Sequence, residues 1–216
     1  MKLYNSLGPN PRLVRMFLLE KGLELPLEEV ALLGGANRQP PYTGKNPGGQ
    51  LPSLELDDGT VLGETVTICE YLEDTNPTPA LIGSTPEEKA ATRQWIRRCE
   101  FKITEPLYNG FRYAEGLSIF KDRMHTLPEA ADGLKACAQD GLGWLDALLE
   151  GRDWIVPDRF SLADIVLYNA VDFGASAGQA LNPKLGNIAA WYERVGARPS
   201  AETSLHEGAA TTGLRG

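Results

Sequence analysis

Two short segments carry residues whose types and spacing suit the binding of a peptide-like ligand. Gln50-Leu51-Pro52 sets a proline at the head of a predicted strand, and Glu64-Thr65 opens a predicted apolar helix. Because proline cannot donate a ladder hydrogen bond, it leaves neighbouring backbone groups free at the start of a strand. The exposed N–H groups of a helix start bind a carboxylate, while Glu64 receives an ammonium group. The two segments therefore predict a site for an amino-acid head group joined to a peptide backbone.

This pattern resembles the glutathione transferase family. In that family the Gln-Val/Leu-Pro segment, with a cis proline, lies against the peptide backbone of glutathione, and a Glu/Gln-Ser/Thr pair holds its γ-glutamyl end. Gln50, Leu51, Pro52, Glu64 and Thr65 match that motif residue by residue. The resemblance implies glutathione as co-substrate in a site made by these residues. The alternative is structural, since many strands begin with proline and many helices with threonine.

The elements around these segments alternate in type up to residue 78. Strands are predicted near 2–4 and 27–31, a helix near 11–21, then a hairpin and a helix ending near 73. Such an order is typical of a small α/β domain, and the resemblance implies that residues 1–78 have a thioredoxin-like fold. The breakers Asn76-Pro77-Thr78-Pro79 then indicate a linker near 77–85.

The rest of the chain is predicted to be helical. Thr85 and Glu88 form a capping box, and Trp95, Cys99 and Ile103 recur every four residues, as on the buried face of a long helix. Pro106 is expected to kink or end that helix. The resemblance implies an all-helical second domain, residues 86–206.

A second capping box predicts another fixed helix start. Ser161 and Asp164 have the spacing of the box, and the resemblance assigns this start to the core of the helical domain. Residues 203–216 are rich in glycine and alanine and are expected to form a loosely held tail.

Glutathione chemistry requires a thiolate, although a free thiol with a pKa of roughly 8.5 is mostly protonated at neutral pH. Aligned on the first helix, Tyr4 matches the tyrosine of the animal alpha, mu and pi classes, Gly8 the serine of the serine classes, and Asn10 the cysteine of the beta class. The Gly8-Pro9-Asn10 order is also similar to the Thr-Pro-Asn of the bacterial nu-like class, without the hydroxyl.

Each residue that could donate a hydrogen bond to the thiolate also has a possible structural role. Asn10 is favoured as the group that stabilises the thiolate, through its side-chain amide or adjacent backbone N–H groups, but it also suits an N-cap followed by Pro11 at the first helical position. Tyr4 is either a catalytic donor or a ring packed in the core. Ser6 is either a donor or a loop residue.

The remaining site residues are also implied by the resemblance. Arg38 lies where the plant phi class has a basic residue and is expected to pair with the glycine carboxylate of glutathione, unless it is an exposed loop arginine; Lys45 is held in reserve. A small hydrophobic electrophile is expected between the two domains. Its pocket is predicted to include Leu7, Tyr108, Phe111 and Arg112, with Tyr113 nearby, although aromatic rows at helical spacing are more often core.

Composition and charge limit the classes of partner that this chain is expected to bind. The net charge of −8 argues against a nucleic-acid or anionic-membrane surface, because phosphate binding needs concentrated lysine and arginine. No apolar run approaches 18 residues and no signal-peptide pattern is found, so a cytoplasmic protein is expected. Three scattered cysteines and two histidines favour neither disulfides nor a metal site. The resemblance implies a homodimer.

Three functions follow from the sequence. The first is a glutathione transferase of the nu-like or beta-like bacterial type, which joins the thiolate to an electrophile or displaces a leaving group. The second is glutathione-dependent reduction of disulfides or peroxides. The third is a binding module without turnover, which the absence of a hydroxyl at Gly8 favours.

Overall fold

The structure is a computed structural model that describes residues 1–216 and divides into two compact units. Unit 1 comprises Met1–Leu81 and Ser200–Gly216, and unit 2 comprises Ile82–Pro199. The division predicted from the sequence, 1–78 and 86–206, differs from these units chiefly after residue 199, where the chain packs with unit 1.

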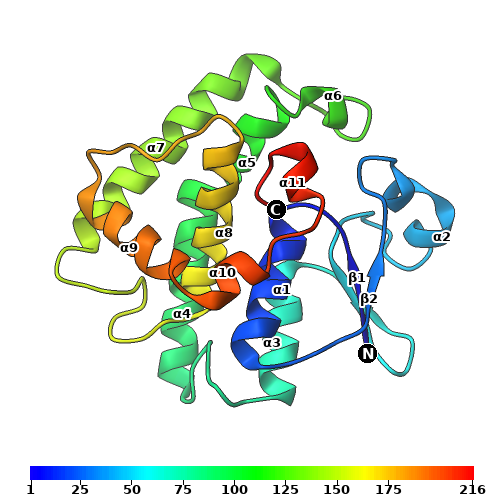
Figure 1. Ribbon diagram of the computed structural model, residues 1–216, viewed down its shortest axis with the longest axis horizontal. Helices are drawn as coiled ribbons and strands as arrows, with labels where there is room; N and C mark the ends of the chain where they lie inside the picture. The colour runs from blue at the N-terminus through cyan, green and yellow to red at the C-terminus, as the bar shows by residue number, and fades with distance from the viewer. The chain divides into compact units, whose positions relative to one another are not determined.

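Unit 1 combines a sheet with short and medium helices, as the alternation of patterns predicts (Figure 1). Its elements are β1 (Lys2–Asn5), α1 (Pro9–Lys21), β2 (Leu27–Glu29), the 3₁₀ turn η1 (Ala36–Arg38), α2 (Pro40–Thr43), β3 (Ser53–Glu55), β4 (Val61–Leu62) and α3 (Thr65–Thr75). Near the end of the chain follow α10 (Pro199–Thr203) and α11 (Ala209–Thr212).

The sheet has the order β2-β1-β3-β4, in which β1 pairs in parallel with β2 and antiparallel with β3, and β3 pairs antiparallel with β4. Leu3 is opposite Leu27 on one side and Leu54 on the other. Side chains alternate along a strand, so Leu3 and Tyr4 face opposite sides of the sheet. Helices α1 and α3 pack together on one side and α2 lies on the other, where Tyr4 contacts Tyr42 (Figure 1).

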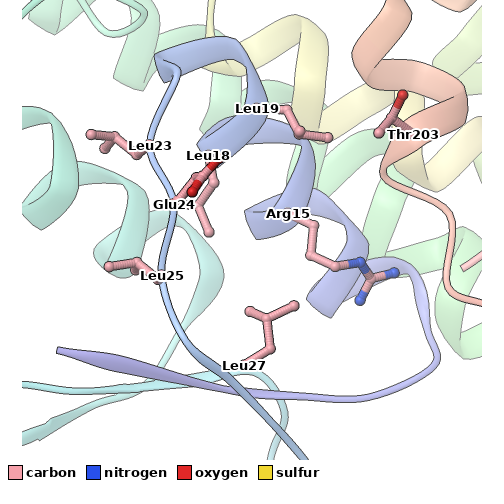
Figure 2. Close-up of a pocket in the computed structure, with 8 residues that line it drawn as sticks. All are labelled: Arg15, Leu18, Leu19, Leu23, Glu24, Leu25, Leu27 and Thr203. Carbon is pink, nitrogen blue, oxygen red and sulfur yellow. The ribbon is translucent and has the colours of Figure 1, made fainter.

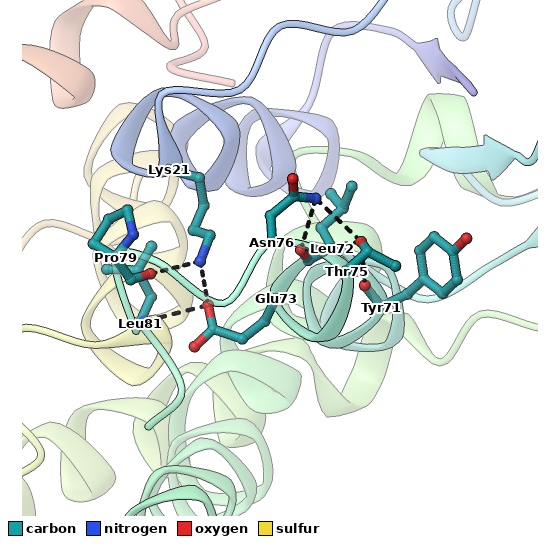
Figure 3. Close-up of polar contacts among 8 residues, drawn as sticks. All are labelled: Lys21, Tyr71, Leu72, Glu73, Thr75, Asn76, Pro79 and Leu81. Atoms are coloured by element: carbon teal, nitrogen blue, oxygen red, sulfur yellow. Dashed lines mark hydrogen bonds and ion pairs between the residues drawn. The ribbon is translucent and has the colours of Figure 1, made fainter. Parts of the chain in front are cut away.

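A buried ion pair joins the C-terminal ends of α1 and α3. Lys21 Nζ lies 2.8 Å from Glu73 Oε2, and the two side chains are 0% and 3% exposed. The ammonium group also donates to Pro79 O at 2.5 Å, and Leu81 N–H donates to the Glu73 carboxylate at 3.3 Å (Figure 3). This network therefore also fixes the segment that follows the cis Thr78-Pro79 bond.

Two arginines of α1 hold the C-terminal segment in unit 1, so the expectation of a loosely held tail is wrong. The guanidinium of Arg12, fully buried, donates to Ser204 Oγ at 3.3 Å, Ala201 O at 2.7 Å and Arg215 O at 3.4 Å. Arg15 donates to Ser204 O at 2.9 Å. The glycine and alanine content of this segment predicted a flexible tail. Instead, carbonyl groups of the segment accept hydrogen bonds from the arginine side chains that α1 buries.

Unit 2 is entirely helical, as predicted. Its elements are α4 (Pro86–Cys99), a π-helical turn η2 (Glu100–Thr104), α5 (Glu105–Arg112), α6 (Leu117–Phe120), the 3₁₀ turn η3 (Pro128–Ala130), α7 (Ala131–Leu148), α8 (Leu162–Ser176) and α9 (Gly186–Gly196). Helix α8 is buried over nearly its whole length.

Both predicted capping boxes are present, one at the start of α4 and one at the start of α8. In the second, the buried carboxylate of Asp164 accepts from the Ser161 N–H and hydroxyl, the Ile155 N–H and the indole N–H of Trp191. Burial raises the pKa of Asp164 to about 6, against the opposing effect of these donors. Local capping chemistry thus fixes where the central helix of unit 2 begins.

Pro106 is the second residue of α5, and the regular α-helical pattern is interrupted directly before this helix by the π-helical turn η2. Proline has no N–H, so it cannot bond to the carbonyl of Lys102 four residues earlier. That carbonyl instead lies against Gly141 of α7, where a Cβ atom would come within 2.3 Å of it. The glycine therefore permits the close contact of α7 with this turn. None of the helices is both long and apolar enough to cross a membrane.

Replacing Lys21 by methionine is expected to lower the free energy of unfolding by about 3–5 kcal/mol, because the Glu73 carboxylate would stay buried without its cation. Chemical denaturation followed by circular dichroism measures the change. Lys45→Met, which removes an exposed ion pair with Glu55, should cost less than about 1 kcal/mol. Equal losses in the two variants would contradict the role given to the buried pair.

Candidate functional site

The Gln50-Leu51-Pro52 segment enters the sheet through a cis Leu51-Pro52 bond, directly before β3, so the expected cis proline is confirmed. The Leu51 side chain is 7% exposed and packs with Tyr4, Val30 and Tyr42. Neither the N–H nor the C=O of Leu51 has a hydrogen-bond partner within the chain. This residue therefore offers one free backbone donor and one free acceptor.

The loop before this segment is held by side chains from η1. Asn37 Nδ2 donates to Gly49 O at 2.7 Å, and Arg38 Nη1 donates to Gly48 O at 3.2 Å. Arg38 was predicted as a cation for a carboxylate, and the structure places its guanidinium against the loop backbone. No local pattern marks Asn37 in the sequence, because its role depends on a contact 12 residues away along the chain.

Helix α3 begins at Thr65, with Glu64 as its N-cap residue. Glu64 has φ 63° and ψ 122°, a backbone conformation that is sparsely populated for any residue with a Cβ atom. Its side chain is exposed and makes no capping hydrogen bond. Ile68 N–H donates to Glu64 O at 2.9 Å, and the three preceding amides have no backbone partner. This helix start therefore retains the donors that an anion requires.

Helix α1 begins one residue before Asn10, so the interpretation of Asn10 as an N-cap with Pro11 at the first helical position is wrong. The N-cap is Gly8, with φ 136°, and Arg12 N–H donates to Gly8 O at 3.1 Å. A left-handed φ of this kind favours glycine, which accounts for the absence of a hydroxyl residue at this position.

The prolines on either side of Asn10 reduce the number of backbone N–H donors at the start of α1. Pro9 and Pro11 have no N–H, so Asn10 carries the free amide of the first turn. The Asn10 side chain is partly exposed and has no hydrogen-bond partner in the chain. One backbone N–H and one side-chain amide are therefore available to an anion here.

The two hydroxyl groups predicted as alternatives to Asn10 are both occupied. Tyr4 Oη donates to the Glu55 carboxylate, and its ring meets that of Tyr42 edge to face at 5.7 Å. The hydrogen bond from Tyr4, followed by that from Lys45, lowers the pKa of Glu55 to about 2. Ser6 Oγ donates to Val30 O at 2.8 Å and is buried.

The end of the chain packs against the N-cap of α1. A Cβ atom added to Gly216 would lie 2.7 Å from Gly8 Cα, and Gly216 O accepts from His206 N–H at 3.0 Å. Leu7, predicted to line an electrophile pocket, contacts the same segment, since a Cβ atom on Gly208 would lie 3.9 Å from its side chain. Residues 206–216 thus border the place where Asn10 lies.

The other predicted electrophile contacts lie on α5 of unit 2. The rings of Tyr108 and Phe111 are 9% and 8% exposed and meet Phe173 edge to face at 6.1 and 4.9 Å. Arg112 Nη1 donates to Asn109 Oδ1 at 2.9 Å. Tyr108, Phe111 and Arg112 therefore lie together on one helix of unit 2, whereas Leu7 belongs to unit 1.

Unit 1 also has an apolar groove of about 340 Å³ that contains none of the predicted site residues (Figure 2). It lies between α1, the segment 23–27 and α10, and Arg15 is one of its lining residues. Its other lining residues are mostly leucines: Leu18, Leu19, Leu23, Leu25 and Leu27, with Glu24 and Thr203.

The cysteines are free, and two of them are buried. Burial raises the pKa of the Cys69 and Cys99 thiols above the usual range, which disfavours their thiolate forms. No cluster of three or more histidine, cysteine, aspartate or glutamate side chains is arranged to hold a metal ion.

Comparisons with known proteins match both halves of the chain to one family. Residues 8–75 match "Glutathione S-transferase, N-terminal domain" and residues 126–199 match "Glutathione S-transferase, C-terminal domain". Glutathione S-transferase 2 of Saccharomyces cerevisiae is 31% identical over 205 residues, which are 92% of this chain and 86% of that protein.

The structure is likewise similar to the crystal structure of Gtt2 from Saccharomyces cerevisiae, with a TM-score of 0.87, 30% identity, and coverage of 95% of this chain and 100% of that one. FtsZ-localized protein A of Caulobacter vibrioides is 31% identical over 89% of this chain and 85% of its own length. Its name describes a location and not a reaction.

Glu64→Gly is expected to raise the free energy of unfolding by about 1 kcal/mol, because glycine relieves a strained φ while adding some freedom to the unfolded chain. Glu64→Ala retains the Cβ atom and should bring no such gain. Denaturant titration of both variants measures the difference. A glycine variant no more stable than the alanine variant would contradict the strain assigned to Glu64.

Proposed function

Because this chain belongs to the glutathione S-transferase family, we propose that it holds glutathione as a thiolate and joins the sulfur to a small hydrophobic electrophile. The family membership also supports the thioredoxin-like fold of unit 1 and the helical fold of unit 2. The observation that carries the proposal is that the N–H and the C=O of Leu51 have no partner in the chain. The starts of α1 and α3, which also have open amides, belong to the same unit.

Each part of glutathione is matched by groups of a different kind. The γ-glutamyl carboxylate suits the open amides at the start of α3, and its ammonium group suits the exposed carboxylate of Glu64. The cysteinyl backbone suits the N–H and C=O of Leu51, which bind it as a strand binds its neighbour. Arg38, whose Nη1 donates to Gly48 O, is the cation of the neighbouring loop that we propose for the glycine carboxylate, with Lys45, which pairs with Glu55, in reserve.

Asn10 is the group we assign to the sulfur. Its backbone N–H and its side-chain amide are both unengaged at the N-terminal end of α1, where the helix dipole favours negative charge. Tyr4 and Ser6 are less suited to this role, because their hydroxyl hydrogens already go to Glu55 and Val30.

Stabilising the anion and positioning the reactants is sufficient for the reaction. The thiol proton passes to solvent, the thiolate sulfur forms a bond to an electrophilic carbon, and a leaving group such as halide departs with its bonding electrons. Leu7, Tyr108, Phe111 and Arg112 remain the proposed contacts of the electrophile. A homodimer is also part of the proposal.

A binding titration followed by two assays tests this function. Purified protein should bind glutathione at millimolar concentration or below in a calorimetric titration, and should conjugate it to chlorodinitrobenzene. Turnover of hydroxyethyl disulfide without conjugation would favour the reductase instead. Absence of glutathione binding would favour a binding module, a role compatible with a relative named for its localisation with FtsZ.

Asn10→Ala is expected to raise the pKa of the bound glutathione thiol by about one to two units, because the anion loses a hydrogen bond worth roughly 1.5–3 kcal/mol. Ultraviolet titration of the thiolate in the complex measures this pKa. Tyr4→Phe and Ser6→Ala, matched removals of the alternative donors, should leave it unchanged. A shift in either control with none in Asn10→Ala would reassign the donor.

A further inference from the structure

The carbonyl group of Gln50 receives two side-chain hydrogen bonds from one short stretch of chain. Tyr42 Oη donates to it at 2.6 Å and Asn46 Nδ2 at 2.8 Å. Tyr42 is in α2, and Asn46 follows four residues later, so the two donors are one helical turn apart in sequence. Both act on the residue that precedes Leu51.

Tyr42 is itself held in a single orientation. Its side chain is 5% exposed, its ring packs against Tyr4 and Leu51, and its hydroxyl lies 2.9 Å from Ser53 Oγ. A phenol has one hydrogen, which goes to Gln50 O, so the Ser53 hydroxyl donates to Tyr42 Oη. Burial raises the pKa of Tyr42, which keeps the phenol protonated and therefore a donor at neutral pH.

The geometry of the peptide bond transmits this constraint to Leu51. The Gln50 C=O and the Leu51 N–H belong to one planar peptide, which is trans, because the cis bonds of unit 1 are Leu51-Pro52 and Thr78-Pro79. In a trans peptide these two groups point in opposite directions. Fixing the Gln50 C=O toward Tyr42 and Asn46 therefore fixes the Leu51 N–H on the opposite side, where it has no partner in the chain.

We propose that Tyr42 and Asn46 are positioning residues for glutathione, which act through the Gln50 carbonyl to orient the free N–H of Leu51. This inference rests on the proposed binding of glutathione and adds two residues that themselves touch no part of it. A flexible Gln50-Leu51 peptide would have to be ordered when the ligand binds, and a peptide already fixed avoids that entropic cost.

Tyr42→Phe and Asn46→Ala each remove one of the two donors, and both should raise the calorimetric dissociation constant for glutathione by about two- to tenfold. Tyr42→Phe retains the ring that packs with Tyr4 and Leu51, so it separates the hydrogen bond from the packing. Removing both donors is expected to weaken binding by more than either single change.

Tyr71→Phe is the matched control, since Tyr71 lies on α3 of the same unit and its hydroxyl has no partner in the chain. It should bind glutathione like the unchanged protein. Thermal unfolding of all variants identifies any that fail to fold, and in such a case the other single variant carries the test.

The amide of Leu51 supplies a second readout, local to the proposed contact and measured at equal glutathione occupancy in every variant. In the unchanged protein, glutathione should protect this amide from hydrogen exchange and shift its ¹⁵N resonance. The protection should be reduced in Tyr42→Phe and Asn46→Ala but kept in Tyr71→Phe. Dissociation constants within twofold of the unchanged protein, with the Leu51 amide equally protected, would overturn the positioning role.

The titration of the unchanged protein separates this inference from the function on which it rests. If the unchanged protein does not bind glutathione, the proposed function and the inference fail together. If it binds glutathione and both variants bind equally well, the proposed function stands and the positioning role alone fails.

Discussion

The buried ion pair of Lys21 with Glu73 fixes the framework on which the site of unit 1 depends. A helix rises about 1.5 Å per residue, so Asn10 lies about 16 Å from Lys21 along α1, and Thr65 about 12 Å from Glu73 along α3. The two helices also pack against each other. Joining their C-terminal ends therefore sets where their N-terminal ends lie. Those ends carry the open amides at Asn10 and after Glu64.

The elements that follow from local chemistry could be predicted from the sequence. Strands β1 and β3, helix α3 and both capping boxes are recognisable because their signals lie within a few residues of each other. The start of α1 was predicted at the wrong residue, because Asn10-Pro11 matches an N-cap followed by proline at the first helical position. The hydrogen bond from Arg12 N–H to Gly8 O places the cap two residues earlier.

Features that depend on distant partners could not be predicted. Helix α2 lies in a stretch rich in glycine and proline that is typical of a loop, and its hydrogen bonds to the residues before Pro52 form only in the folded chain. The same holds for residues 200–216, whose order depends on the buried guanidinium groups of Arg12 and Arg15. The Gln50-Leu51-Pro52 motif is recognisable in the sequence, whereas the hydrogen bonds that reach Gln50 from Tyr42 and Asn46 are not.

The groups available to a ligand in unit 1 are mostly backbone groups. Leu51 contributes its N–H and C=O, and the start of α3 contributes amides; none of these depends on the identity of the side chain. The conformation of this backbone involves a proline after Leu51, a glycine at position 8 and side-chain donors to the Gln50 carbonyl. At the start of α1 the side-chain amide of Asn10 is the group that we propose for the sulfur, and unlike the backbone groups it depends on the identity of the residue.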